Sequence, residues 1–189
     1  DLKPSEFTFG SNKKVWWKCP KGEDHLWEAR ISRRTEGSGC PFCSGQKPCK
    51  VNSLAVLNPN LAKEWHPDKN GVLKPTDVSC GSGKTVWWKC PKGDDHVWEA
   101  VICKRTERTG CPFCAGHKPC KDNRLSIRHP DLAKEWHPTK NGDLKPSDCT
   151  CGTEKRVWWK CAKGEEHEWE ARVCKRTDGI GCPFCAGHK

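Results

Sequence analysis

The sequence of 189 residues predicts three small β-rich modules in tandem, with short connecting helices, rather than one domain around a large core. Its composition is the first reason: it has sixteen cysteines, eleven tryptophans, no methionine or tyrosine, and a hydrophobic fraction of only 34%. The second reason is an internal repeat, because Val-Trp-Trp-Lys-Cys and Cys-Pro-Phe-Cys each occur three times at intervals of 71 residues. Modules of this size rarely gain enough stability from an apolar core alone, so disulfides or bound metal are expected.

The constant interval means that no residues are inserted between copies. We place the modules at residues 1–49, 50–120 and 121–189. The first copy lacks the segment found before the hairpin in the other two, at residues 53–71 and 126–142. We therefore expect this chain to be excised from a longer array, with a naturally shorter first repeat as the alternative.

Each module is expected to contain a β-hairpin. Residues 13–19 alternate in character, which places Val15 and Trp17 on one face of a strand and Trp16 on the other. A Pro-Lys-Gly turn then breaks this strand. A second alternating strand is predicted over residues 25–33.

A short helix is expected before the second and third hairpins, at residues 59–65 and 130–136. Proline suits the first turn of a helix, and the apolar residues that follow share one face. A His-Pro pair ends each helix, so His66 and His137 are expected to cap or pack there.

Every copy also carries Cys-x5-His, a gap of fourteen residues and Cys-x2-Cys. Thiolate sulfur and imidazole nitrogen in a set of four suit tetrahedral Zn²⁺. Because four protein ligands leave no open position, three structural zinc sites in zinc-ribbon or treble-clef-like hairpins are predicted. The ligand sets are Cys19, His25, Cys40 and Cys43; Cys90, His96, Cys111 and Cys114; and Cys161, His167, Cys182 and Cys185.

Two other interpretations compete for these cysteines. A disulfide framework in a secreted protein would give no reason for a histidine at the same place in every copy. Redox chemistry at Cys-Pro-Phe-Cys would need an activated cysteine at the start of a helix, and no helical period follows the motif. Zinc is the interpretation that uses all four recurring residues.

Seven cysteines remain outside these sets. Cys80 and Cys103 recur together one period later, whereas the first copy has Phe9 and Ser32 at their places. We therefore expect the two positions to touch, either as packed thiols or as a disulfide. The full set is Cys49, Cys80, Cys103, Cys120, Cys149, Cys151 and Cys174.

With these motifs together, the sequence resembles a family of zinc-ribbon repeats of uncharacterised function that occur in tandem. The resemblance covers essentially the whole chain and implies zinc ligands at the twelve positions above. Some members of that family lie beside nuclease-like domains, which implies work on nucleic acid by association only. No nuclease motif is apparent in this sequence, and no enzymatic activity is expected.

The net charge of +10 favours an anionic partner, and about +7 would remain with three zinc ions bound to nine thiolates. We expect nucleic acid, more specifically DNA, on the hairpin face opposite Val15. Tryptophan can stack on bases while lysine and arginine neutralise phosphates. The residues expected there are Trp16, Lys18 and Arg34; Trp87, Lys89 and Arg105; and Trp158, Lys160 and Arg176.

A protein-interaction module that reads a peptide or an acidic partner is the alternative. Trp16, Trp87 and Trp158 could instead pack against the connecting helices. In addition, Glu28 and its counterparts would weaken an anion-binding face. We expect a monomer without a membrane segment, because no run of about 18 apolar residues occurs. A reducing compartment, nucleus or cytoplasm, is the expected location.

Overall fold

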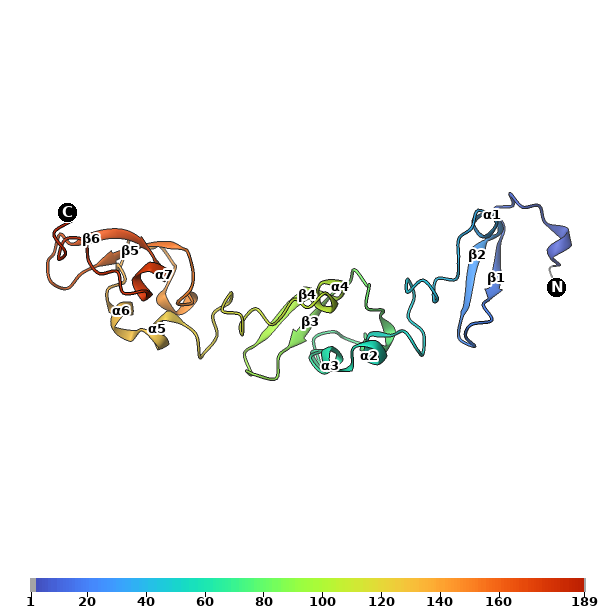
Figure 1. Ribbon diagram of the computed structural model, residues 1–189, viewed down its shortest axis with the longest axis horizontal. Coiled ribbons are helices and arrows are strands. Elements are labelled where there is room, and N and C mark those ends of the chain that lie inside the picture. Colours follow the sequence, from blue (N-terminus) through green and yellow to red (C-terminus); the bar gives the residue numbers. More distant parts are fainter. Residues whose placement is uncertain (1–2, 189) are drawn as a thin grey trace. The chain divides into compact units, whose positions relative to one another are not determined.

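The computed structural model describes residues 3–188 and shows one two-stranded antiparallel hairpin in each repeat (Figure 1). In each hairpin, the second tryptophan of the first strand lies opposite the tryptophan of the second strand, as Trp17 does with Trp27. The strands are β1 (Lys14–Lys18) and β2 (Leu26–Arg30), β3 (Thr85–Lys89) and β4 (Val97–Val101), and β5 (Arg156–Lys160) and β6 (Glu168–Arg172). We call the face of Trp17, Trp88 and Trp159 the inner face, and that of Trp16, Trp87 and Trp158 the outer face.

A one-turn helix follows each hairpin: α1 (Ile31–Thr35), α4 (Ile102–Thr106) and α7 (Val173–Thr177). The prediction of a strand over residues 25–33 is therefore wrong beyond Arg30. Because the first strand begins at Lys14, the chain after Arg30 is tied back by two backbone bonds, from Ile31 N to Lys13 O and from Ser32 N to Ser11 O, and by the Thr35 hydroxyl, which donates to Phe9 O. Turning into a helix buries the first helical side chain, which is fully enclosed at Ile102 and Val173.

Short helices also precede the second and third hairpins. The predicted helices exist as α3 (Pro59–Ala62) and α6 (Pro130–Lys134), which begin at proline as expected and end earlier than predicted. Two further turns stand before them, α2 (Leu54–Leu57) and α5 (Leu125–Arg128). Three 3-10 turns start at proline, at η1 (Pro4–Glu6), η2 (Pro75–Asp77) and η3 (Pro146–Asp148).

In repeats 2 and 3, the segment that carries these helices lies on the inner face of the hairpin that follows it in the sequence. In repeat 2, Trp65 bridges to Trp88, and the two rings meet edge to face at 5.5 Å. Leu54 and Trp88 are fully buried, and Trp136 repeats this contact on Trp159 at 5.4 Å in repeat 3. We call residues 53–73 and 124–144 the cover segments. Each of the two covered hairpins therefore has a small aromatic core beside its ligand set.

Among the described residues, no helix combines the length and the apolar character that crossing a bilayer would require.

Candidate metal centres and outer hairpin faces

The hairpin turn of each repeat supplies two of the predicted ligands. In repeat 1, Cys19 N donates to His25 O, which closes the loop between β1 and β2 and sets the two side chains side by side. Cys40 and Cys43 come from a tight turn after α1, where Ser44 N donates to Cys40 O. Cysteine and histidine from two loops therefore converge, and the same convergence occurs in all three repeats.

The distances within each cluster fit a tetrahedral zinc ion. Cys19 Sγ lies 3.7 Å from Cys43 Sγ, and His25 Nδ1 lies 3.7 and 3.6 Å from the sulfurs of Cys40 and Cys43. Repeats 2 and 3 show the same edges, between 3.6 and 3.8 Å. Zn–S bonds of about 2.3 Å and Zn–N bonds of about 2.0 Å give tetrahedral edges of roughly 3.5 to 3.8 Å. A disulfide would need a sulfur–sulfur distance of about 2.05 Å, so the spacing of these sulfurs fits metal ligands and not a disulfide.

Each ligand histidine is held on both sides of its ring. Phe42 stacks on His25 with the centroids 5.1 Å apart and the planes 11° from parallel, and repeats 2 and 3 have the same stack. On the other side lies the backbone of Gly22, where an added Cβ would come within 2.7 Å of the imidazole. Glycine at this place in the turn therefore lets the ring approach the backbone with Nδ1 toward the sulfurs.

The opposite nitrogen of the ring faces a second group of side chains. His25 Nε2 has no hydrogen-bond partner among the described residues and lies 4.0 Å from Asp24 Oδ1. The ligand atoms of Asp24, His25 and Cys49 lie within 4.8 Å of one another. Asp24 also accepts a 2.7 Å bond from Lys50 N, which lowers the pKa of its carboxyl. Outer groups of this kind orient a ligand histidine, so the linker after the ligand set helps to position it.

Repeat 2 has the same outer group, formed by Asp95, His96 and Cys120. An asparagine ties this linker to the ligand turn as well: Asn123 accepts a bond from Cys120 N and donates to Phe113 O at 3.1 Å. The sequence alone left Cys49 and Cys120 without a role. The structure places both, buried, behind the ligand histidine.

Thiol chemistry in the clusters favours a bound cation. Burial and the neighbouring Cys19 and Cys40 sulfurs raise the pKa of the Cys43 thiol to about 11. The same causes raise the pKa of Cys114 to about 12 and that of Cys185 to about 11. Ionisation of one thiol therefore disfavours ionisation of its neighbour unless a positive charge lies between them. A divalent ion would favour the thiolates and release protons when it binds.

The other recurring cysteine pair lies on neighbouring segments. The Thr106 hydroxyl donates to Cys80 O at 3.0 Å and to Cys103 O at 2.7 Å, and Thr177 does the same for the corresponding carbonyls in repeat 3. Both thiols are free and half-buried. The predicted proximity of these two positions is therefore seen at the backbone. No disulfide joins any of the sixteen cysteines, all of which lie in the described part of the chain.

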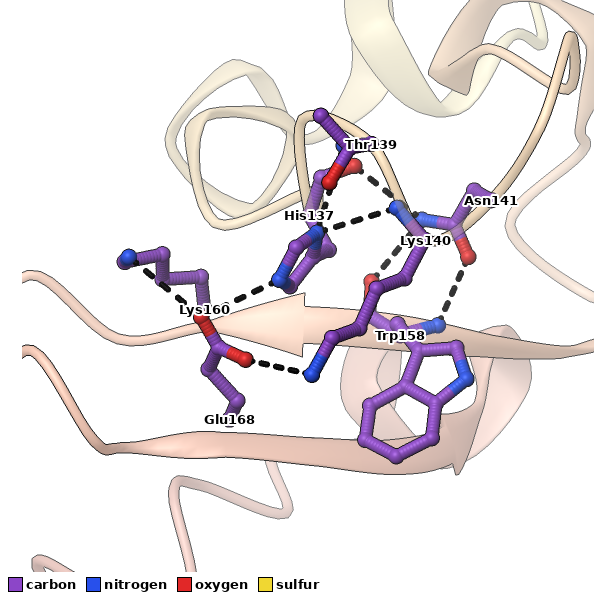
Figure 2. Close-up of polar contacts among 7 residues, drawn as sticks. All are labelled: His137, Thr139, Lys140, Asn141, Trp158, Lys160 and Glu168. Carbon is purple, nitrogen blue, oxygen red and sulfur yellow. Dashed lines mark hydrogen bonds and ion pairs between the residues drawn. The ribbon is translucent and has the colours of Figure 1, made fainter.

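His66 and His137 hold the turn that follows each cover tryptophan. His137 Nδ1 accepts bonds from Thr139 N and Lys140 N, as Figure 2 shows, and His66 does the same in repeat 2. Both histidines hold the local turn as expected, because Nδ1 of each ring accepts bonds from the following backbone and neither ring joins a ligand set among the described residues.

Repeat 3 adds an ion cluster at this turn. Glu168 lies 2.6 Å from Lys140 Nζ, 3.3 Å from Lys160 Nζ and 3.1 Å from His137 Nε2 (Figure 2). The Lys140 bond is the largest cause that lowers the pKa of Glu168, to about 2. Repeat 2 has Val97 at the position of Glu168, so its lysines lack this acid.

The residues predicted to bind nucleic acid divide into two groups. Trp16 is 73% exposed, and Trp87 and Trp158 are half-buried on the outer face, each directly opposite a glutamate of the next strand. Lys18, Lys89 and Lys160 follow two residues later on the same face. Lys69 lies over Trp87 at 4.1 Å, and Lys140 over Trp158 at 4.6 Å.

The expectation that Arg105 and Arg176 share this face is wrong. They are buried, at 6% and 7% exposure, and each guanidinium lies over two inner-face tryptophan rings at 5.1 to 5.2 Å. Each also pairs with an acid of the cover segment, Glu64 or Glu135. The reason is the early end of the second strand, because α4 and α7 turn these residues over the inner face. Arg34 likewise lies over Trp17 and Trp27, so none of the three is an outer-face cation.

The outer face carries further cations: Lys14, which the sequence places near this face, and Arg30, Arg156 and Arg172, which the sequence analysis did not single out. Lys14 lies opposite Arg30 in repeat 1, and Arg156 lies opposite Arg172 in repeat 3. Both pairs share the face of the outer tryptophan, two residues away along the strand. Alternation along one strand already places Lys14 and Arg156 on this face, and the pairing register adds that Arg30 and Arg172 lie directly opposite them.

The comparison with protein families agrees with this geometry. The chain matches the model of a family described as the probable treble clef zinc finger domain at residues 1–46, 61–117 and 132–188. No curated protein matches the chain. The matched segments contain all twelve clustered ligands and span most of the sequence. The chain therefore belongs to this treble clef zinc finger family, whose domain it carries three times.

Proposed function

We propose that this chain is a non-enzymatic zinc-binding array that binds nucleic acid, and DNA in particular, through its outer hairpin faces. Each ion would be held by three thiolates and one imidazole, which fill a tetrahedron and leave no position for substrate. When bound, Zn²⁺ would supply the cross-link that small cores of this kind need. The free thiols of the chain suit a reducing compartment, nucleus or cytoplasm.

The outer face of repeat 1 carries this proposal. It holds an exposed tryptophan, Trp16, with three cations and one acid on the same face. An exposed indole can stack on a base for about 1 to 3 kcal/mol, while nearby cations replace counterions on the phosphates. The cations are Lys14, Lys18 and Arg30, and the acid is Glu28.

The other two outer faces support the same function with different strength. In repeat 2, Lys69 lies over Trp87 and Lys89 follows it on the same face, and within residues 3–188 no acid forms an ion pair with either lysine. In repeat 3, Glu168 already holds Lys140 and Lys160. We therefore expect repeats 1 and 2 to contribute more to binding than repeat 3.

The test is electrophoretic mobility shift and fluorescence anisotropy of the zinc-loaded chain with duplex DNA, single-stranded DNA and RNA over a range of salt. One variant changes Lys18, Lys89 and Lys160 to alanine. If each lysine neutralises one phosphate of duplex DNA, the salt slope should decrease by up to about 2.7.

The matched control changes the exposed helix cations Arg33, Lys104 and Lys175 to alanine. It removes the same charge from each repeat, at residues whose acid partners lie three positions along the chain. The proposal expects a clearly smaller loss of slope in the control. Equal losses would point to net charge alone, and absence of binding to all three probes would overturn the proposal.

A peptide or an acidic protein remains the second candidate ligand. One observation favours it, namely a mostly apolar groove on repeat 1 that Trp16 of the outer face and Trp17 of the inner face both line.

A further inference from the structure

A pocket of about 420 Å³ lies where the ligand turn of repeat 2 meets the cover segment of repeat 3. Three segments line it, namely the end of the ligand turn, helix α5 with the residue after it, and the loop before β5. The lining includes no cluster ligand and no residue assigned to an outer hairpin face. The polar residues of the lining are His117, Asn123, Arg128, His129, Thr150 and Cys151.

We call residues 44–58 and 115–129 the first and second junctions, because each leads from one ligand turn into the next cover segment. Both junctions have the same asparagine bond, in which Asn52 or Asn123 donates to the phenylalanine carbonyl of the ligand turn. Three neutral side chains of the first junction correspond to one arginine and two histidines of the second, and these three basic side chains all line the pocket. The corresponding pairs are Gln46 and His117, Leu57 and Arg128, and Asn58 and His129.

Arg128 is held by one bond that leaves its terminal nitrogens available. Its Nε donates to the backbone oxygen of Asp122 at 2.8 Å. Within residues 3–188, no acid forms an ion pair with this guanidinium, and the carboxylate of Asp131 is held by Lys134 at 2.7 Å. The terminal nitrogens of an arginine can donate in parallel to two oxygens of one phosphate.

The other groups of the pocket add donors without adding negative charge. The imidazoles of His117 and His129 each offer at least one N–H donor. Burial raises the pKa of the Cys151 thiol although Arg128 opposes this, so the thiol stays uncharged at neutral pH. In the described part of the chain, the ligand atoms of these three residues are not grouped within 4.8 Å of one another, so they do not assemble a metal site. The pocket therefore suits an anion rather than a metal cation.

We propose that the pocket of the second junction binds a phosphate group. Arg128 holds two phosphate oxygens, and the imidazole N–H groups of His117 and His129 donate to the others. The phosphate is either free or part of a nucleic-acid backbone, and separate titrations distinguish the two sources. The site shares no residue with the outer hairpin faces, so it stands whether or not those faces bind nucleic acid.

The test is NMR titration of the zinc-loaded, ¹⁵N-labelled chain with inorganic phosphate, at an ionic strength held constant with sodium chloride. We expect saturable shifts at Arg128 Nε, at the imidazole nitrogens of His117 and His129 and at the amide of Gly152. A dissociation constant of about 1 mM is expected, because two or three hydrogen bonds to a charged group suffice for it. A short DNA duplex is the second probe. Shifts of the same groups with DNA would assign the phosphate to a nucleic-acid backbone, and shifts with inorganic phosphate alone would assign it to a free anion.

The decisive variant gives the second junction the residues of the first, with His117→Gln, Arg128→Leu and His129→Asn combined. It should bind phosphate at least about tenfold more weakly, because the charged donor is lost. Its other amide signals should be unchanged, because the first junction folds with these residues. Lys118→Gln is the matched control and should bind as the parent does, since both junctions have this exposed lysine and it lies outside the lining.

Absence of saturable shifts in the pocket with both probes, up to about 20 mM phosphate, would overturn the proposal. An unchanged response of the triple variant would do the same, and so would a fourth zinc ion that Cys151→Ser removes in native mass spectra. DNA binding that still depends on Lys18, Lys89 and Lys160 would show that the proposed function survives such a failure.

Discussion

Repeats 1 and 2 have the same ligand cluster, yet their hairpins differ in what lies on the inner face. Trp88 is fully buried under the cover segment of repeat 2, while Trp17 remains half-buried beside an open groove. The ligand distances differ by no more than 0.1 Å between the two repeats. The ligand geometry of a repeat therefore does not depend on a cover segment. The ligand cluster and the cover segment are separate sources of stability.

This difference separates the contributions of metal and core. The cross-link holds the loops at one end of the hairpin, and the cover segment buries the tryptophans of the inner face. Loss of metal should affect all three repeats, whereas loss of the cover should affect repeats 2 and 3 only.

The largest effect should come from removing a ligand. Cys111→Ser opens the cluster of repeat 2, and structural zinc contributes on the order of 10 kcal/mol to folding of such modules. We expect repeat 2 to unfold, which would appear as loss of dispersed amide signals from that repeat in NMR spectra. Cys103→Ser is the control, because this thiol is half-buried but lies outside the cluster. Comparable unfolding in both variants would contradict the role assigned to the ligand.

Truncation of a tryptophan in a cover segment should have the next largest effect on stability. Trp65→Ala removes the ring that meets Trp88 edge to face, and such a change in a core costs about 3 to 5 kcal/mol. Trp16→Ala removes a ring that is 73% exposed and should change the free energy of unfolding by less than about 1 kcal/mol. Denaturant unfolding of both zinc-loaded variants compares the two sites. A larger loss of unfolding free energy for Trp16→Ala than for Trp65→Ala would contradict the assignment of these residues to outer and inner faces.

A smaller loss is expected from the buried ion pair. Glu64→Gln leaves the Arg105 side chain, which is only 4% exposed, without its acid, and breaking a buried pair costs up to about 3 to 5 kcal/mol. The cost should fall below that range because Glu64 is 27% exposed, so water reaches the site. Lys63→Gln beside it is the control for thermal unfolding. Equal stability of the two variants would show that the pair contributes nothing.

The smallest effect should be the loss of the Glu168 ion cluster of repeat 3 at low pH. The pKa of Glu168 is lowered to about 2 in the folded chain, below the value of about 4.3 for a free glutamate. Its stabilising contribution is thus complete above the unfolded pKa and is lost as pH falls toward 2. We expect the ¹³C shift of this carboxyl to stay nearly constant as the pH falls from about 6 to about 3.5. A titration midpoint of Glu168 near the free value of about 4.3 would contradict the ion cluster.

Much of this fold follows from the interval of the repeat. The twelve ligands, the hairpins and the opposite faces of Trp16 and Trp17 can be predicted, because ligand spacing and strand alternation are local properties. The position of Arg105 could not be predicted, since it depends on the strand ending at Val101 and on Glu64, which lies 41 residues earlier. Alternation continues past the true end of the strand, and nothing in the local pattern marks the turn into α4.

The outer groups behind His25 and His96 also escaped the sequence analysis. Asp24 and Cys49 meet only after the linker folds back onto the hairpin turn, through the Lys50 and Asn52 bonds. Spacing alone does not distinguish such a cysteine from a surplus thiol. Internal comparison did bring Cys80 and Cys103 together, because both change in the same copy.

We propose that every repeat, with or without a cover segment, holds its own zinc ion. Native mass spectrometry of the zinc-loaded chain tests it most directly, with Cys40→Ser as the paired variant in repeat 1. We predict three ions per chain and two in the variant, with repeats 2 and 3 still folded. Two ions in the parent chain, or three retained in the variant, would contradict the claim.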